Sequence, residues 1–568
     1  MVKYFYTKRK RNTQNHGRSG RMTRLRTRLK TRALLLAALL LCACLLTSCA
    51  GKKAAPVTME PVSNRSWYLR VVDEEPDTVD FQCTNIHYAV ALNVFDRLVE
   101  TQTDGKGNTK IVPSLAESWT VSDDGLKYTF RLRKGVRFSD GQLLTASDVE
   151  YTLRRMLTHP RSRCREIAEG IVGADLLESR QTDRLAGFTD LGDHTFSITL
   201  EAPFPAFLAS LSMPPASILS EESVTAAGDA FGKDPAKTVG TGPFILDSWT
   251  PGEGMVLRAN PDCWQGAPGV DGIELYYVTD EVEQRLMFER GELDILDLNK
   301  LGDEAEYFVH GDIYRKRIHT APQVDISYIA LNQAVEPLND VRVRRALQIS
   351  LNRQMILDAL YAGRGTVENG IFPHALKGFN PDLEPIEYDP AGAVTLLAEA
   401  GYPSGFELEI QVNASAGRTV RDLMTIAASM WKKIGVKATI TVLPESGFME
   451  RRTSGAATCY TANWSADYND PDNFIYTFFG SEDNTVYRSL NYPDREVIKR
   501  VQDARAILDE EERMKEYAAL ERKIIREDAS WIPLFSHTHL YVTSERVGHF
   551  ETAWNGSSQP VFRKITLK

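Results

Sequence analysis

Four side chains that end in a carboxylate or a carboxamide fall within six residues of one another, at Asp467, Asn469, Asp470 and Asp472. Trp464 stands just before them. Oxygen atoms of these types can ligate Ca²⁺, form a hydrogen-bonded turn, or compensate a positive charge that enters a pocket. The three kinds of chemistry require different spacings, so the sequence can test them in part.

The spacing argues against a calcium loop. An EF-hand loop that begins at Asp467 needs glycine at its sixth position and glutamate at its twelfth. The chain has Asp472 and Phe478 there. An Asx-rich turn over 469–473 fits the composition and is compatible with a polar pocket wall. The sequence therefore leaves a turn, a pocket wall, or both.

Catalytic signatures are missing from the sequence. It contains no GxSxG, HExxH or Walker pattern. His537 and His539 form an HxH pair on an expected strand, which we interpret as two exposed strand histidines rather than a metal site. A triad of dispersed residues is the remaining enzymatic alternative. We predict a protein that is not an enzyme and that holds no cofactor and no metal.

The cysteines of the body of the chain support the same interpretation. Four of them follow residue 49, at Cys83, Cys164, Cys263 and Cys459. Their wide spacing matches no zinc template. Export would permit disulfides, but the sequence does not determine which cysteines pair.

The first 48 residues have the pattern of a secretory signal. They contain twelve Lys or Arg and no acidic residue, and 33–46 is an unbroken apolar run. As a helix this run spans about 21 Å, short of the roughly 30 Å membrane core. Leu46-Thr47-Ser48-Cys49 resembles a bacterial lipobox, which predicts a lipid on Cys49; an ordinary signal is the alternative. Met22 begins a conventional signal, so we expect translation to start there.

The exported chain that this predicts is acidic. Without residues 1–48 it keeps 55 of 67 basic residues against 76 acidic ones, a net charge near −21. Such a charge argues against nucleic acid as a partner and against a basic membrane-binding surface. Residues 49–64 are interpreted as a lipidated tether. About 500 residues follow, more than one hydrophobic core holds, so two or three lobes are expected.

Apolar periodicity predicts a mixed α/β fold. Three segments alternate apolar and polar residues as half-buried strands do: 127–133, 406–412 and 436–442. Between the last two, apolar residues recur at helical spacing from Leu423 to Ile434, and Gly435 ends the helix. Strand, helix and strand in this order predict a right-handed crossover with parallel strands.

The remaining elements follow the same logic. Asn339 or Asp340 is expected to cap a helix that carries Val343, Leu347 and Leu351. An acidic helix is predicted near 507–527. Strands are predicted around 531–535 and 540–543.

Several stretches together resemble one family. They are 113–156, 239–249 (VGTGPFILDSW), 290–295 (RGELDI), 338–353 and 393–406, and they resemble the extracellular solute-binding proteins, family 5, of peptide, oligopeptide and nickel ABC importers. The resemblance covers nearly the whole exported chain. It implies an α/β, two-lobed periplasmic-binding-protein-like fold (type II, cluster C) with an extra subdomain and discontinuous lobes joined by crossing strands.

The resemblance also implies domain boundaries and partners. Lobe I would combine 65–95, 206–324 and 536–568; the extra subdomain would be 96–205 and lobe II 325–535. The lobes would close over a ligand. The implied partners are a peptide, an ABC permease and its ATPase, and the membrane through the lipid on Cys49, with the protein itself a monomer.

The ligand site is implied by a motif of the peptide-binding members. In them a tryptophan is followed three residues later by an aspartate that pairs with the peptide's α-ammonium, which here are Trp464 and Asp467. The ligand is held as an added β-strand, here by Cys83-Thr84-Asn85 and Asn463-Trp464-Ser465. Oligopeptide members carry two further arginines near the ligand; this chain has Thr461 at the nearer position and Arg452 at the farther one.

The departure at Thr461 puts recognition of the ligand's C-terminal carboxylate, and the ligand's length, in doubt. Other ligands on the same fold are the main alternative: a nickel chelate, haem, glutathione or a signalling peptide. A secreted lipoprotein hydrolase is the second alternative.

Overall fold

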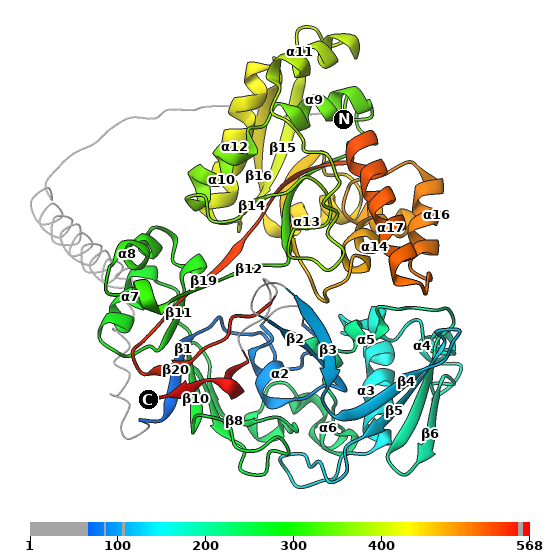
Figure 1. Ribbon diagram of the computed structural model, residues 1–568, viewed down its shortest axis with the longest axis vertical. Helices are drawn as coiled ribbons and strands as arrows, with labels where there is room; N and C mark the ends of the chain where they lie inside the picture. Colours follow the sequence, from blue (N-terminus) through cyan, green and yellow to red (C-terminus); the bar gives the residue numbers. More distant parts are fainter. Residues whose placement is uncertain (1–65, 85–86, 105–107, 555–560) are drawn as a thin grey trace, which may run out of the picture. The chain divides into compact units, whose positions relative to one another are not determined.

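A computed structural model describes residues 66–84, 87–104, 108–554 and 561–568 (Figure 1). The predicted signal (1–48), the tether (49–64), the lipidation site Cys49 and the site residue Asn85 lie outside the described residues. In the described part, no helix is both long and apolar enough to cross a membrane.

A seven-stranded sheet is built from three separate parts of the described chain. Its spatial order is β12 (Ile318–Pro322), β19 (Thr538–Thr543), β11 (Ile295–Asp297), β1 (Tyr68–Val72), β10 (Gly272–Tyr276), β9 (Gly254–Ala259) and β8 (Phe244–Thr250). Strand β1 pairs in parallel with β10 and β11, and the other pairings are antiparallel. This body of the fold is therefore discontinuous in sequence.

A second region contains an antiparallel sheet, here called the β5 sheet. Its described strands are β4 (Ala116–Val121), β5 (Lys127–Leu132), β7 (Thr195–Thr199) and β6 (Phe188–Gly192). The predicted strand 127–133 is thus confirmed. Helix α3 (Ala146–Thr158) and the hairpin of β2 (Val99–Thr103) and β3 (Thr109–Pro113) accompany it. The apolar core of this region also takes in Tyr468, from much later in the chain.

A third region contains the β13 sheet, in the order β14 (Thr366–Val367), β18 (Trp531–Ser536), β13 (Asp325–Leu331) and β17 (Cys459–Ser465). Its core is aromatic, with Tyr328, Phe478 and Trp531 in mutual contact. Around it lie the helices α9 (Val341–Ile349), α10 (Arg353–Tyr361), α11 (Pro390–Glu399), α13 (Glu445–Thr453), α14 (Asp472–Phe479), α15 (Glu482–Tyr487), α16 (Arg495–Ala504) and α17 (Glu510–Glu521).

The predicted crossover is present in this third region. Strands β15 (Glu407–Asn413) and β16 (Lys437–Leu443) pair in parallel, with α12 (Arg418–Lys433) between them in sequence. Gly435 follows the helix with φ +91°, a conformation that favours glycine. Asp340 caps α9 by accepting from the Arg342 amide at 2.8 Å, as predicted, but α9 ends at Ile349, so Leu351 lies beyond it.

Two short segments connect the seven-stranded sheet with the β13 sheet. One runs from β12 to β13, and the other from β18 to β19; they are the green and red strands that cross between the two sheets in Figure 1. His537 lies in the second segment. Its backbone N–H donates to the Asp325 carboxylate at 2.8 Å and its Nδ1 lies 2.5 Å from the same carboxylate. A hydrogen-bonded histidine–carboxylate pair therefore joins the two crossings, and it is an ion pair when His537 is protonated.

The interpretation of His537 and His539 as exposed histidines is wrong. The His539 side chain is buried, and its Nδ1 contacts Gln323 at 3.3 Å. The His537 side chain is only 18% exposed. Sequence spacing did not reveal this because the partner carboxylate, Asp325, lies more than 200 residues away.

The His537 pair makes stability depend on pH. Burial lowers the pKa of His537, but the Asp325 charge and hydrogen bond raise it above its ordinary value of 6.5. A raised folded-state pKa gives stability that is complete below the unfolded pKa and is lost as pH rises through the folded one. As pH is raised from about 6 to about 9, we expect the urea midpoint of unfolding to fall more for the wild type than for His537→Asn. Equal pH dependence in the two proteins would contradict this assignment.

Candidate ligand site

Three of the four Asx side chains have structural roles. The Asp470 carboxylate accepts hydrogen bonds from both terminal nitrogens of Arg513, at 2.7 and 2.8 Å. The Asp472 carboxylate accepts hydrogen bonds from the hydroxyls of Tyr468 and Tyr517, at 2.8 and 3.2 Å. Asn469 accepts the Lys377 amide at 2.7 Å. The predicted Asx-rich turn over 469–473 is present in its first part, where the Asp472 amide donates to the Asp470 carboxylate at 3.0 Å, whereas Asp472 and Asn473 already belong to α14.

Asp467 is the exception in this stretch. Its backbone N–H donates to the Asn473 side-chain oxygen at 2.9 Å, and its carboxylate accepts from the Asn473 side-chain nitrogen at 3.1 Å. The Trp464 indole donates to the same Asn473 oxygen at 3.3 Å. One amide at the start of α14 thus fixes both residues of the predicted motif.

The Asp467 carboxylate has no cationic partner within hydrogen-bond reach among the described residues. Burial raises its pKa, while the Asn473 hydrogen bond and the charge of Arg488 lower it in part. A half-buried carboxylate with a raised pKa and a single neutral donor gains free energy when a cation binds beside it.

Helix α2 (Ala89–Val94) and residues around it share a cavity with Asp467. Asp467 lines a cavity of about 140 Å³ together with Leu92, Arg97, Ser212 and Trp554. Burial and then the Asp467 charge raise the pKa of the Tyr88 hydroxyl. Burial raises the pKa of Glu166 to about 7, and the Asp467 charge adds to that rise. Glu166 is therefore a carboxylate close enough to interact electrostatically with Asp467, and Glu100 and Glu551 line the same cavity as Asp467.

Strand β17 supplies the other predicted contact residues. Asn463, Trp464 and Ser465 lie at its C-terminal end, as predicted, and pair with β13. Within the described sheet β17 is an edge strand, with β13 as its ladder partner. Half of the backbone groups of an edge strand point away from its ladder, so an extended peptide can add here.

The other side chains of β17 are partly engaged. The exposed Asn463 accepts from the Ser327 hydroxyl at 3.2 Å. The Thr461 hydroxyl donates to the Tyr328 carbonyl at 2.9 Å. Thr461 therefore supplies a satisfied hydroxyl where oligopeptide-type members are expected to carry a charge.

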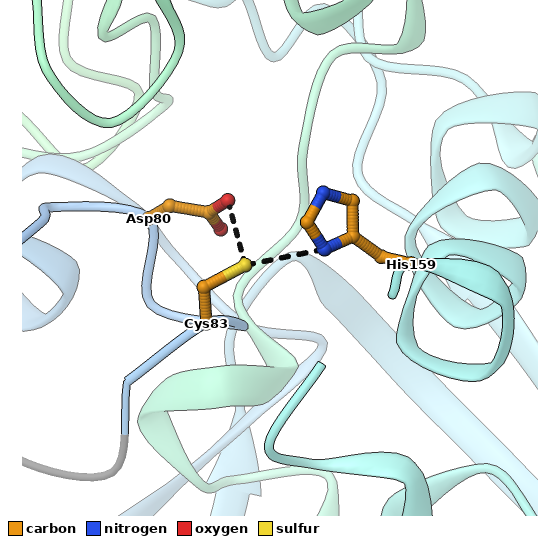
Figure 2. A group of neighbouring side chains, drawn as sticks. All are labelled: Asp80, Cys83 and His159. Carbon is orange, nitrogen blue, oxygen red and sulfur yellow. Dashed lines mark hydrogen bonds between the residues drawn. The ribbon is translucent and has the colours of Figure 1, made fainter. Parts of the chain in front are cut away.

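Cys83 and Thr84 are buried and lie in a turn, so the prediction of a strand through these two residues is wrong. The Thr84 carbonyl accepts from the Tyr88 hydroxyl at 3.1 Å. Figure 2 shows the Cys83 thiol between the Asp80 carboxylate, 3.0 Å away, and the His159 ring, 3.3 Å away.

The Asp80, Cys83 and His159 cluster does not fit a metal or a catalytic nucleophile. Its ligand atoms lie within 4.8 Å of one another. However, Arg155 donates to both oxygens of Asp80, at 3.0 and 2.6 Å. Burial, with the Asp80 charge, raises the pKa of the Cys83 thiol to about 12. Both metal binding and nucleophilic attack require the thiolate. The four described cysteines of the body are free and buried.

Sequence reasoning found Arg452 but missed a second arginine. Arg452 lies in the last turn of α13, and its guanidinium carbon is 5.6 Å from the Tyr487 ring centroid. Arg488 follows α15 and lies over Trp464, at 5.5 Å, and over Phe478, at 4.7 Å. No motif marks Arg488; only its packing against Trp464 brings it to the site.

Comparison with known proteins identifies the family. Residues 110–485 match the middle region of the bacterial extracellular solute-binding proteins, family 5. The chain belongs to this family. Its two-lobed α/β fold with crossing strands, predicted from the resemblance, is confirmed by solved relatives.

Relatives of this solute-binding protein are similar over most of their length. The haem-binding protein A of Haemophilus influenzae is 30% identical over 81% of this chain and 84% of that protein. The dipeptide-binding protein of Escherichia coli is 29% identical over 80% and 85%. A solved structure, a periplasmic binding protein DppA from Helicobacter pylori in complex with the peptide STSA, is 26% identical with a TM-score of 0.71 and covers 88% and 97%.

The family assignment bears on the class of function. Members of the family are extracellular and bind solutes. This agrees with the prediction of a binding protein rather than an enzyme, and with the acidic, exported chain inferred from the sequence.

Proposed function

We propose that this solute-binding protein captures short peptides and delivers them to the permease and ATPase of an ABC importer, while a lipid on Cys49 holds it at the membrane. The α-ammonium of the peptide pairs with Asp467, and the peptide backbone pairs with the outer edge of β17. The protein acts as a monomer and carries out no reaction on the peptide.

The observation that carries this proposal is the state of the Asp467 carboxylate. It is half-buried, fixed by Asn473 and without a cation within hydrogen-bond distance among the described residues. An ammonium that leaves water needs a carboxylate or several acceptors to compensate it. Asp467, with Glu166 nearby, supplies that compensation.

The proposed domain division is lobe I (65–95, 206–324 and 536–568), extra subdomain (96–205) and lobe II (325–535). Two contacts link lobe II to the extra subdomain. Asn469 donates to the Thr109 hydroxyl at 2.9 Å, and the Arg505 guanidinium carbon lies 4.2 Å from the centre of the Phe204 ring. Opening of the lobes about the crossing strands would break these contacts and admit the ligand.

Haem is the second candidate ligand, because the relative from Haemophilus influenzae is named for binding it. Haem has no ammonium group, so it would leave Asp467 uncompensated. The peptide is favoured for this reason.

The amine requirement tests the proposal. A tripeptide present at 100 times its dissociation constant should raise the free energy of unfolding by about 2.7 kcal/mol. The same peptide with an acetylated amino group should give little of this gain at equal concentration, because it brings no charge to Asp467. Thermal unfolding followed by fluorescence measures both.

Haem serves as the comparison ligand in the same assay. Equal stabilisation by free and acetylated peptides, or stabilisation by haem alone, would contradict the peptide proposal. Cleavage of the peptide in the same tube, followed by mass spectrometry, would point to an enzyme instead.

A further inference from the structure

Arg452 and Arg488 lack an anionic partner throughout the described chain. Neither guanidinium forms a hydrogen bond or an ion pair there, and the Nε of Arg452 is buried without a partner. Both pack against one ring, that of Tyr487, with the guanidinium carbon 5.6 Å from its centroid in each case. Tyr487 itself is 47% exposed. The two charges therefore flank an accessible aromatic surface.

The arginines that are fully buried in the described chain have hydrogen-bond partners for their terminal nitrogens. Arg513 pairs with Asp470, and Arg155 pairs with Asp80. Arg344 has no carboxylate partner but donates to four backbone carbonyls, those of Leu338, Asn339, Asp528 and Ala529. Arg452 and Arg488 are half-buried and lack such partners among the described residues. A partly desolvated charge without a partner gains free energy when an anion binds beside it.

The two guanidiniums also repel each other. Burial lowers the pKa of Arg488, and the neighbouring charge of Arg452 lowers it further. An anion that binds near both guanidiniums relieves this repulsion.

The position of the pair relates it to the ligand site. Arg488 lies over Trp464, three residues before Asp467. Strand β17 ends at Ser465, so the three residues of chain from Trp464 to Asp467 span at most about 10 Å. An extended peptide of two or three residues covers a similar length. A peptide whose ammonium meets Asp467 therefore has the right length to bring its other end to Arg488.

We propose that Arg452 and Arg488 form a dianion subsite that selects short peptides ending in Asp or Glu. The terminal carboxylate compensates one guanidinium and the side-chain carboxylate compensates the other. Arginine suits this task because its planar fork binds a carboxylate through two hydrogen bonds. The subsite supplies the positive charge that Thr461 does not. This inference rests on the proposed function and adds its substrate class.

Calorimetry with three matched tripeptides tests the subsite: Ala-Ala-Glu, Ala-Ala-Gln and the α-amide of Ala-Ala-Glu. The wild type should bind Ala-Ala-Glu about tenfold more tightly than either of the others, the effect of one charge-assisted hydrogen bond. Arg488→Gln and Arg452→Gln should each reduce this preference to about twofold or less. Arg488→Lys, which keeps the charge but not the fork, should give an intermediate preference.

Arg500→Gln is the matched control. The Arg500 guanidinium is 40% exposed and pairs with Glu516 at 2.7 Å, so this variant should keep the full preference for Ala-Ala-Glu. Circular dichroism and the melting temperature report whether each variant folds. If one of the two site variants does not fold, the other still gives the test.

Three outcomes separate the two proposals. Equal affinity of the wild type for the three peptides, with the amine requirement intact, would overturn the dianion subsite and leave the proposed function standing. A preference for Ala-Ala-Glu that survives in both site variants would overturn the assignment to these arginines. Failure of every peptide to bind would overturn both proposals.

Discussion

Arg513→Met should lower the free energy of unfolding by about 3–5 kcal/mol, because it leaves a buried carboxylate without its partner. The Asp470 and Arg513 side chains are only 5% and 4% exposed, and they share two hydrogen bonds. Methionine keeps much of the apolar stem but none of the charge. Chemical denaturation of the purified protein measures the loss, with the midpoint compared as well as the extrapolated value because a multi-lobed chain need not unfold in one step.

Two further variants make this measurement specific. Arg500→Met removes a partly exposed guanidinium and should cost no more than about 1 kcal/mol. Adding Asp470→Asn to Arg513→Met removes the stranded charge but keeps an oxygen for the Asp472 amide, so it should restore part of the lost stability. If Arg513→Met and Arg500→Met lose the same free energy of unfolding, the buried pair contributes no more to stability than the exposed one.

The Arg513 pair also bears on the ligand site. Asp470 and Asp472 fix the turn that follows Asp467, through Arg513, Tyr468 and Tyr517. Tyr468 enters the apolar core of the β5 sheet region. Peptide affinity should therefore fall in Arg513→Met although that residue contacts no ligand.

The helices and strands that could be predicted from the sequence are those determined by residues close together in the chain. The alternating segments 127–133, 406–412 and 436–442 became β5, β15 and β16, since one face of each is apolar. The helix that ends before Gly435 and the cap at Asp340 were also predictable, because a glycine and an Asx residue act within a few positions. Leu351 was misplaced because helix ends depend on backbone geometry that periodicity does not encode.

Long-range partners account for what the sequence did not disclose. The distance along the chain from His537 to Asp325 hid their contact, and no local pattern shows that Asp470 pairs with Arg513, 43 residues later. Cys83 lies on no strand because its thiol is held by Asp80 and His159. The sequence did not indicate Arg488, because the residue comes close to Trp464 through the packing of the chain after α15 and not through a sequence motif.

Asp467→Asn should weaken the binding of a free-amine tripeptide by about 10- to 100-fold, the range that corresponds to 1.5–3 kcal/mol for one charge-assisted hydrogen bond. Asparagine keeps the shape of the side chain and an oxygen for the Asn473 donor, so the loop should keep its conformation. Affinity for the acetylated peptide should change little, because that peptide has no ammonium. Calorimetry on the four combinations of protein and peptide isolates the pairing energy.

The pH dependence of binding provides an independent check on the same pairing. Because burial raises the pKa of Asp467, the unliganded carboxyl takes up a proton at a higher pH than an exposed aspartate does. A bound ammonium favours the charged form, so peptide affinity should fall as pH is lowered through that raised pKa. Asp467→Asn should lose this dependence, whereas the exposed control Asp123→Asn should keep both the affinity and its pH profile. If Asp467→Asn still discriminates fully between free and acetylated peptides, another carboxylate, such as Glu166, Glu100 or Glu551, must receive the ammonium.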